Sequence, residues 1–158
     1  MKSAKRKIYG FWILLAEAAG ALSGWLSREG TAAFSETATQ PPLSPPGILF
    51  PIVWGILYLL MGISAARIYQ SPPSQSRSRG LNLWVMQLVV HFFWSPIFFN
   101  VQAYGFALLW LLLLWILVLL MILSFRKIDP LAAWLQLPYL LWLTFAAYLN
   151  AGVWYLNK

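Results

Sequence analysis

The sequence has no cysteine and very little charge. None of its 158 residues is Cys, which excludes disulfides, thiolate metal ligands and thiol redox chemistry. Charged residues make up 9% of the chain, whereas they make up about a quarter of an average soluble domain. Hydrophobic residues make up 61%. A water-soluble fold of this length could not bury so much apolar surface, so the composition predicts an integral membrane protein.

The charges that are present are mainly basic and lie at the ends of apolar stretches. The formal net charge is +7. Lys and Arg at such positions orient membrane helices and meet anionic lipid headgroups. The basic residues do not form a stripe interleaved with exposed aromatic residues, which binding of a nucleic-acid strand would require. We therefore expect the lipid bilayer, and no nucleic acid, as a partner.

The apolar stretches predict an all-α bundle of five transmembrane helices, in a single domain over residues 1–158. At ~1.5 Å per residue, each stretch is long enough for a hydrocarbon core of about 30 Å. The first stretch follows four positive charges, as in a signal peptide, but it continues past Glu17 to Leu26, so we expect an uncleaved helix. Four prolines within residues 41–46 predict a stiff, extended loop over 27–46. The predicted helices are 8–26, 47–69, 81–99, 104–125 and 131–155.

The distribution of Lys and Arg predicts the orientation in the membrane. With five spans, the amino terminus and the gaps around 71–80 and 126–129 share one side, which holds nine basic residues. The opposite side holds only Arg28 and Lys158. This asymmetry places the amino terminus in the cytoplasm if the protein resides in a plasma-type membrane.

Three predicted helices carry aromatic and polar side chains at spacings of three and four, which places them on one face of each helix. Polar groups are costly in hydrocarbon, so these faces should point into the bundle. Two interpretations remain open from the spacing alone. The faces could form a pocket for a large, flat, mainly apolar ligand, or they could bond between helices and fill the core. The residues are Trp54, Tyr58 and Met61 in the second predicted helix; Trp84, Gln87, His91, Ser95, Phe98 and Gln102 along the third; and Tyr139, Trp142, Ala146 and Asn150 in the fifth.

Two further patterns concern helix packing. Pro96 and Pro138 lie inside predicted helices and should kink them, which either opens space between helices or adjusts their packing.

Ala16, Gly20 and Gly24 recur at every fourth position of the first helix. Small residues at this spacing allow two helices to approach closely, either within the chain or across a dimer.

Three stretches of the sequence form a distinctive set of motifs. They are Pro45-Pro46-Gly47 with residues 50–58; Gln87-Leu88 with Trp94-Ser95-Pro96; and Asp129-Pro130 with Pro138-Tyr139-Leu140, Trp142 and Leu149-Asn150. In this order and spacing they resemble the TspO/MBR family of tryptophan-rich sensory and translocator proteins. The resemblance implies a five-helix bundle, commonly a homodimer, whose pocket binds tetrapyrroles (porphyrin or haem), sterols and other flat apolar molecules. A membrane receptor, sensor or transporter is thus expected, with porphyrin or haem as a ligand and no obligatory cofactor. A porphyrin-degrading enzyme is the alternative.

The resemblance also implies which residues form the pocket. Joined with the helix faces described above, the expected ligand-binding residues are Trp54, Tyr58, Gln87, His91, Trp94, Ser95, Phe98, Tyr139, Trp142, Phe145, Ala146 and Asn150. The preceding loop would act as a lid, and its expected residues are Phe34, Pro41, Pro45 and Pro46.

Two departures from the family pattern affect the expected chemistry. The family commonly has tryptophans in the first loop, and here Phe34 and Leu43 stand at those positions, which argues against the photo-oxidative porphyrin breakdown proposed for some members. His91 stands where the family commonly has Asn in the third span. A neutral imidazole can donate and accept hydrogen bonds as Asn does, but it can also ligate haem iron. No nucleophile–base pair or carboxylate dyad is evident, so binding is favoured over catalysis.

Overall fold

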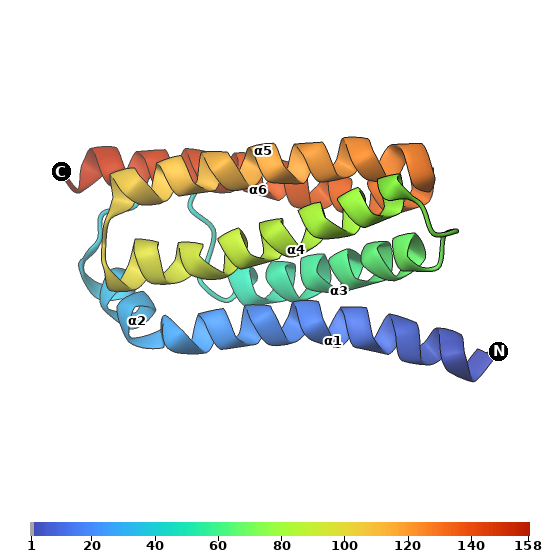
Figure 1. The fold of residues 1–158 in the computed structure, drawn as a ribbon. Coiled ribbons are helices and arrows are strands. Elements are labelled where there is room, and N and C mark those ends of the chain that lie inside the picture. The colour runs from blue at the N-terminus through green and yellow to red at the C-terminus, as the bar shows by residue number, and fades with distance from the viewer. Residues whose placement is uncertain (1) are drawn as a thin grey trace.

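The computed structural model describes residues 2–158 and shows long helices packed side by side with their axes roughly aligned (Figure 1). Five helical spans are long and apolar enough to cross a membrane, the third of them comprising α4 and η1. This confirms the predicted all-α bundle of five transmembrane helices. The elements are α1 (Lys2–Leu26), α2 (Arg28–Thr37), α3 (Leu49–Tyr69), α4 (Gln75–Ser95), η1 (Pro96–Asn100), α5 (Tyr104–Ile128) and α6 (Pro130–Leu156).

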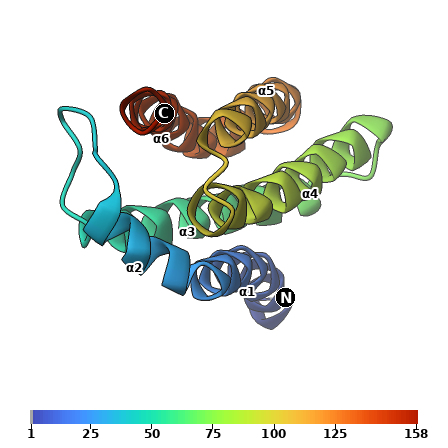
Figure 2. The same cartoon turned by 90° about the vertical axis from the view of Figure 1, so that its left-hand side faces the viewer.

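Seen along their axes, the five spanning helices form a ring (Figure 2). Helix α1 packs against α3, α3 against α6, α6 against α5, and α5 against α4, while α4 also meets α1 and closes the ring. The short helix α2 and the loop after it lie at the end of the bundle that holds the end of α6 (Figure 1). This arrangement brings α3, α4 and α6, the helices that carry the aromatic and polar faces, around one interior.

The predicted loop over 27–46 is wrong in its first half. Residues Arg28–Thr37 form helix α2, which contains no proline, and the extended loop covers only 38–48. Phe34 anchors α2, because its ring lies 5.3 Å from the rings of both Phe98 and Phe99. Hydropathy missed this helix because its ten residues are largely polar and too few to span a membrane.

Two spanning helices begin six residues earlier than predicted, α1 at Lys2 rather than 8 and α4 at Gln75 rather than 81. The first turns of both helices are polar, so they lie outside the apolar stretches from which the helix boundaries were predicted. Ser74 caps α4 by accepting a hydrogen bond from the backbone N–H of Arg77, at 3.0 Å. Pro96 begins the π-helical turn η1, in which the N–H of Val101 bonds the carbonyl of Pro96, five residues earlier.

The opposite end of the bundle is joined by a side-chain ion pair. Arg67 near the end of α3 donates to Asp129 at 2.7 Å, and Asp129 also caps α6 by accepting from the N–H of Leu131. One turn into the bundle, the hydroxyl of Ser64 donates to the carbonyl of Ala132 at 2.8 Å. Polar groups thus follow the seam between α3 and α6 from this end inward.

Small residues allow α1 and α3 to approach closely. A Cβ at Gly62 would overlap the backbone of Ile13, and a Cβ at Gly20 would overlap the ring of Tyr58. Ala16 is fully buried, whereas a Cβ at Gly24 would meet nothing within 4 Å. The structure therefore uses Ala16 and Gly20 for a contact inside the chain, and the expected homodimer cannot be assigned to them.

We predict that Gly62→Ala destabilises the protein by about 1–3 kcal/mol, because a new methyl group must push the α1 backbone away. Gly55→Ala in the same helix is the matched control, since its Cβ would have open space and alanine favours the helix. Thermal unfolding of both variants in the same detergent measures the difference. Equal transition temperatures would show that the α1–α3 contact is looser than described.

Candidate functional site

A hydrogen-bonded chain of four buried side chains lies at the centre of the bundle. His91 of α4 is 9% exposed. Its Nε2 lies 2.7 Å from the hydroxyl of Tyr58 in α3, and its Nδ1 lies 2.9 Å from the hydroxyl of Tyr139 in α6. Tyr139 in turn donates to Oε1 of Gln87 at 2.8 Å. The chain links three helices through one imidazole.

The direction of these bonds follows from the last one. Since Tyr139 uses its only proton to reach Gln87, its oxygen must accept from Nδ1–H of His91. In a neutral imidazole Nε2 then accepts the proton of the Tyr58 hydroxyl. The neutral imidazole therefore carries its proton on Nδ1, a tautomer that is assigned from the hydrogen-bond network.

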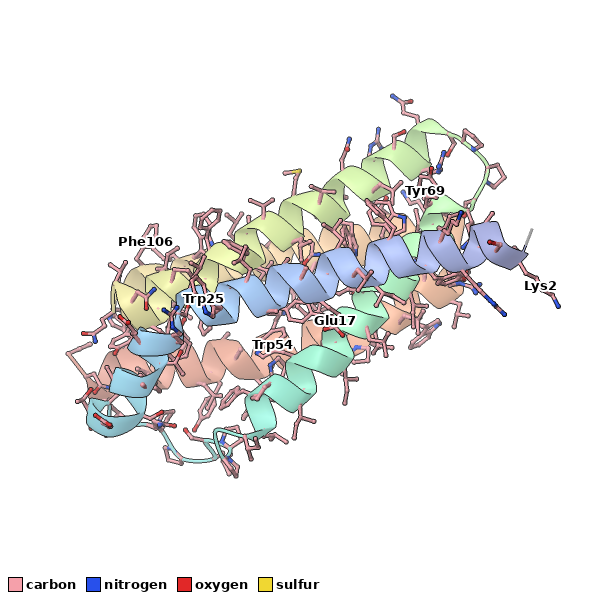
Figure 3. All side chains as sticks on the ribbon, turned by 90° about the horizontal axis from the view of Figure 1, so that it is seen from below. Lys2, Glu17, Trp25, Trp54, Tyr69 and Phe106 are labelled. Carbon is pink, nitrogen blue, oxygen red and sulfur yellow. The ribbon has the colours of Figure 1, made fainter. Side chains whose placement is uncertain are left out.

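Aromatic rings surround this polar chain at the seam of α3 and α6. Trp54 lies on the side of α3 that faces the rest of the bundle (Figure 3). Its ring meets the imidazole of His91 edge-on at 4.6 Å and the ring of Trp142 at 6.3 Å, perpendicular to it. Trp142 also lies 6.0 Å from Phe50 and 5.4 Å from Phe145. The four rings of Phe50, Trp54, Trp142 and Phe145 are called the aromatic box below.

An apolar groove of about 430 Å³ borders the aromatic box. Its walls come from α3 and α6, and Pro138 and Leu141 on its rim are exposed. Pro138 thus lies beside open space at the surface of the bundle. The groove faces sideways out of the bundle, which in a membrane is toward the lipid. Its lining consists entirely of apolar residues, namely Val53, Leu57, Pro138, Leu141, Trp142 and Phe145.

Other predicted pocket residues form a second cluster nearer to α2. Trp94 donates to Oδ1 of Asn150 at 3.1 Å, and Asn150 donates to the carbonyl of Tyr104 at 2.9 Å. The ring of Phe98 stacks on Trp94 at 4.8 Å, with Phe34 of α2 beyond it. The predicted set is therefore divided between two clusters rather than lining one surface.

Ser95 and Ala146 complete the predicted set, and both are half-buried. Ala146 packs against the main core, whereas Ser95 makes no side-chain hydrogen bond within residues 2–158. Neither adds a polar contact to the chain centred on His91.

The predicted lid loop is held against the last part of α6 by polar contacts. The side chain of Asn157 accepts from the N–H of Thr39 at 2.9 Å and donates to its carbonyl at 2.7 Å. The hydroxyl of Tyr148 donates to the carbonyl of Pro42 at 2.7 Å. Sequence reasoning missed Asn157 and Tyr148, because their partners are backbone groups more than a hundred residues away.

The prolines of the loop differ in their environment. Pro41 is buried, and it lies so close to Gly152 that a Cβ there would overlap its ring. Pro45 is half-buried and Pro46 exposed. Of the predicted lid residues, Pro41 therefore makes the closest contact with the bundle, and Phe34 belongs to α2 instead.

The sequence matches a known protein family. The sequence model of the TspO/MBR family matches residues 12–156. The chain belongs to the TspO/MBR family. Protein CrtK of Rhodobacter capsulatus is 37% identical over 126 residues, which cover 79% of each chain. Tryptophan-rich protein TspO of Chlorobaculum tepidum is 36% identical over 122 residues, 77% of each chain. The translocator protein of Bos taurus is 31% identical over 147 residues, 92% of this chain and 87% of its own.

In this TspO/MBR protein, both nitrogens of His91 are engaged by tyrosines. Iron ligation at His91 therefore requires one ring nitrogen to give up its hydrogen bond to a tyrosine hydroxyl and to bind the metal instead. The ring of Trp54 also packs against the imidazole. To reach iron, the imidazole would therefore have to rotate, or the side chains around it would have to move. Iron ligation stays a prediction, whereas hydrogen bonding to helix neighbours is what the structure shows.

We predict that Tyr139→Phe destabilises the protein more than Tyr58→Phe. The first removes two hydrogen bonds and should cost about 2 kcal/mol, while the second removes one and should cost about 1 kcal/mol. Both changes delete one oxygen from a buried tyrosine, so each controls for the other. Thermal unfolding in detergent measures the order, and a larger effect of Tyr58→Phe would contradict the set of hydrogen bonds described above.

Proposed function

We propose that the protein is a membrane receptor, sensor or transporter that binds tetrapyrroles, either porphyrin or haem, and sterol-like molecules at the α3–α6 seam. The observation that carries this proposal is the aromatic box directly beside an apolar groove. Clefts of about 300–1,000 Å³ with apolar and aromatic walls are typical of small-molecule sites. The groove has a comparable volume, about 430 Å³, although it is shallow and open along one side.

The shape of the box favours a flat ligand. The rings of Trp54 and Trp142 stand at 90° to each other, so a planar molecule in the groove could stack on one ring and meet the edge of the other. Because no charged residue lines the groove, an apolar molecule can reach it from the bilayer without passing through water.

A few polar groups lie behind the aromatic box. The chain of Tyr58, His91, Tyr139 and Gln87 could exchange one internal hydrogen bond for a bond to the polar edge of a ligand. The names of the relatives, a tryptophan-rich sensory protein and translocator proteins, are compatible with a binding role. A homodimer with a cytoplasmic amino terminus is part of the same proposal.

We predict that Trp142→Leu weakens protoporphyrin binding by about 1–3 kcal/mol, because it removes a large stacking surface from the groove wall, by analogy with bases stacked on aromatic side chains. Trp134→Leu is the matched control, because Trp134 lies on the same helix but is 68% exposed and does not line the groove. Absorbance titrations of the purified protein give both affinities. If both variants weaken protoporphyrin binding equally, or neither weakens it, the binding site does not lie at the α3–α6 seam.

We predict that His91→Asn leaves protoporphyrin binding within a few-fold of wild type, because Asn can still donate and accept one hydrogen bond each. Haem tests iron ligation in the same titration. If His91 ligates iron, wild type binds haem more tightly than protoporphyrin and the variant loses that advantage. Equal affinities for the two ligands in both proteins would leave His91 as a purely structural residue. Appearance of a new absorbing product under illumination would instead favour the porphyrin-degrading enzyme.

A further inference from the structure

A second hollow lies on the surface of the first turns of α4 and shares no residue with the groove at the α3–α6 seam. It is shallow and has a volume of about 330 Å³. Its lining residues recur at spacings of three and four, so they follow one face of α4. The face is polar over its first turns and apolar after them. The lining residues are Gln75, Ser78, Arg79, Asn82, Leu83 and Met86, of which all but the half-buried Leu83 are exposed.

The change of polarity along this face follows the layers of a lipid leaflet. The start of α4 lies at the end of the bundle that holds the amino terminus (Figure 1). Arg79 and Met86 are two helical turns apart, or ~10 Å along the axis, a distance over which a leaflet changes from headgroups to acyl chains. Ser78 and Asn82 therefore lie at headgroup depth, whereas the side chain of Met86, which is 51% exposed, faces acyl chains. The face matches one lipid molecule aligned with α4.

The charges at this end of the bundle indicate the sign of the headgroup. Of the four acidic residues in the chain, only Asp129 lies at this end, and it is bonded to Arg67. The guanidinium of Arg77 stacks over the ring of Tyr69 at 4.8 Å. By contrast, Arg79 has no ion pair, side-chain hydrogen bond or aromatic ring as a partner within residues 2–158. Its guanidinium is therefore free to bind an anion, and its planar fork of donors suits the oxygens of a phosphate.

Helix α5 adds positive charge close to the hollow. A Cβ at Gly80 would lie 3.1 Å from the ring of Phe125, so the start of α4 packs against the last turn of α5. Arg126 and Lys127 follow Phe125 directly, and both are exposed. Basic groups from two helices thus meet at this end of the α4–α5 contact. Several cations without a nearby carboxylate favour a headgroup with a net negative charge over a zwitterionic one.

We propose that the hollow on α4 binds one molecule of an anionic phospholipid. The guanidinium of Arg79 holds the phosphate, Ser78 and Asn82 donate hydrogen bonds to the headgroup, and an acyl chain lies along Leu83 and Met86. The site depends on an arginine without a protein partner at the polar end of a hollow whose other end is apolar. It is separate from the α3–α6 seam and does not depend on the ligand proposed there.

The test measures which lipid lies beside the hollow, in vesicles of equal parts phosphatidylglycerol and phosphatidylcholine. The natural chain has no cysteine, so Val89→Cys provides a single exposed thiol, one turn beyond Met86, for a small fluorophore. Bromine on the acyl chains of one lipid or the other quenches the fluorophore when that lipid is adjacent. We expect phosphatidylglycerol to be preferred by about fivefold or more, roughly what one basic residue contributes at an anionic surface. Leu109→Cys on α5, which is 65% exposed and does not line the hollow, should show no preference.

A charge substitution separates a specific site from general attraction to a basic surface. Arg79→Gln in the Val89→Cys protein should abolish the preference, because it removes the group that holds the phosphate. Arg6→Gln is the matched control, since it removes the same charge from an exposed position of α1 that does not line the hollow. Equal quenching by the two lipids, a preference that survives Arg79→Gln, or an equal loss with Arg6→Gln overturns the proposal. Quenching by neither lipid also overturns it, because a second copy of the chain would then cover this face.

Discussion

The imidazole of His91 holds the interior of this bundle together, because it is bonded at both nitrogens to tyrosines of two other helices. A histidine and two phenols cannot be left unpaired inside a bilayer, where water is not available to satisfy them. Their pairing therefore constrains where α3 and α6 stand relative to α4. The position of Trp54, whose ring packs edge-on against the imidazole, follows from the same constraint.

This constraint shapes the proposed binding site. The imidazole of His91 and the hydroxyls of Tyr58 and Tyr139 are engaged with one another, so the surface left for a ligand is the aromatic box and the apolar groove at the α3–α6 seam. A ligand that binds there gains mainly apolar and stacking contacts, and hydrogen bonds must be exchanged rather than newly formed. Such a site favours flat, poorly soluble molecules over polar ones. The loop tied to α6 through Asn157 and Tyr148 covers the neighbouring end of the bundle.

The sequence predicted the architecture well because hydropathy and helical periodicity report directly on membrane spans and interior faces. Tyr58, Gln87, His91 and Tyr139 were expected on inward faces, and the structure brings them together in one chain. Their pairing could not be predicted, since it depends on how three separate helices are placed.

Helix α2 and the early start of α4 escaped prediction because their polar turns lie outside the apolar stretches. The division of the pocket residues into two clusters likewise depends on tertiary packing. It follows from the bond of Trp94 to Asn150, which spacing along a single helix does not reveal. Ligand identity, membrane orientation and the homodimer stay predictions, because they concern molecules beyond the single chain.

The central claim, that flat apolar ligands bind at the groove between α3 and α6, is tested most directly by blocking the groove. The natural chain has no cysteine, so Leu141→Cys provides a single thiol on the groove wall for a bulky maleimide. Leu109→Cys on α5 is the matched control, because the two leucines are 63% and 65% exposed and only Leu141 lines the groove. We expect labelling at Leu141→Cys to reduce protoporphyrin affinity at least tenfold, about 1.4 kcal/mol, and labelling at Leu109→Cys to leave it unchanged. Undiminished binding with the groove blocked would contradict the account.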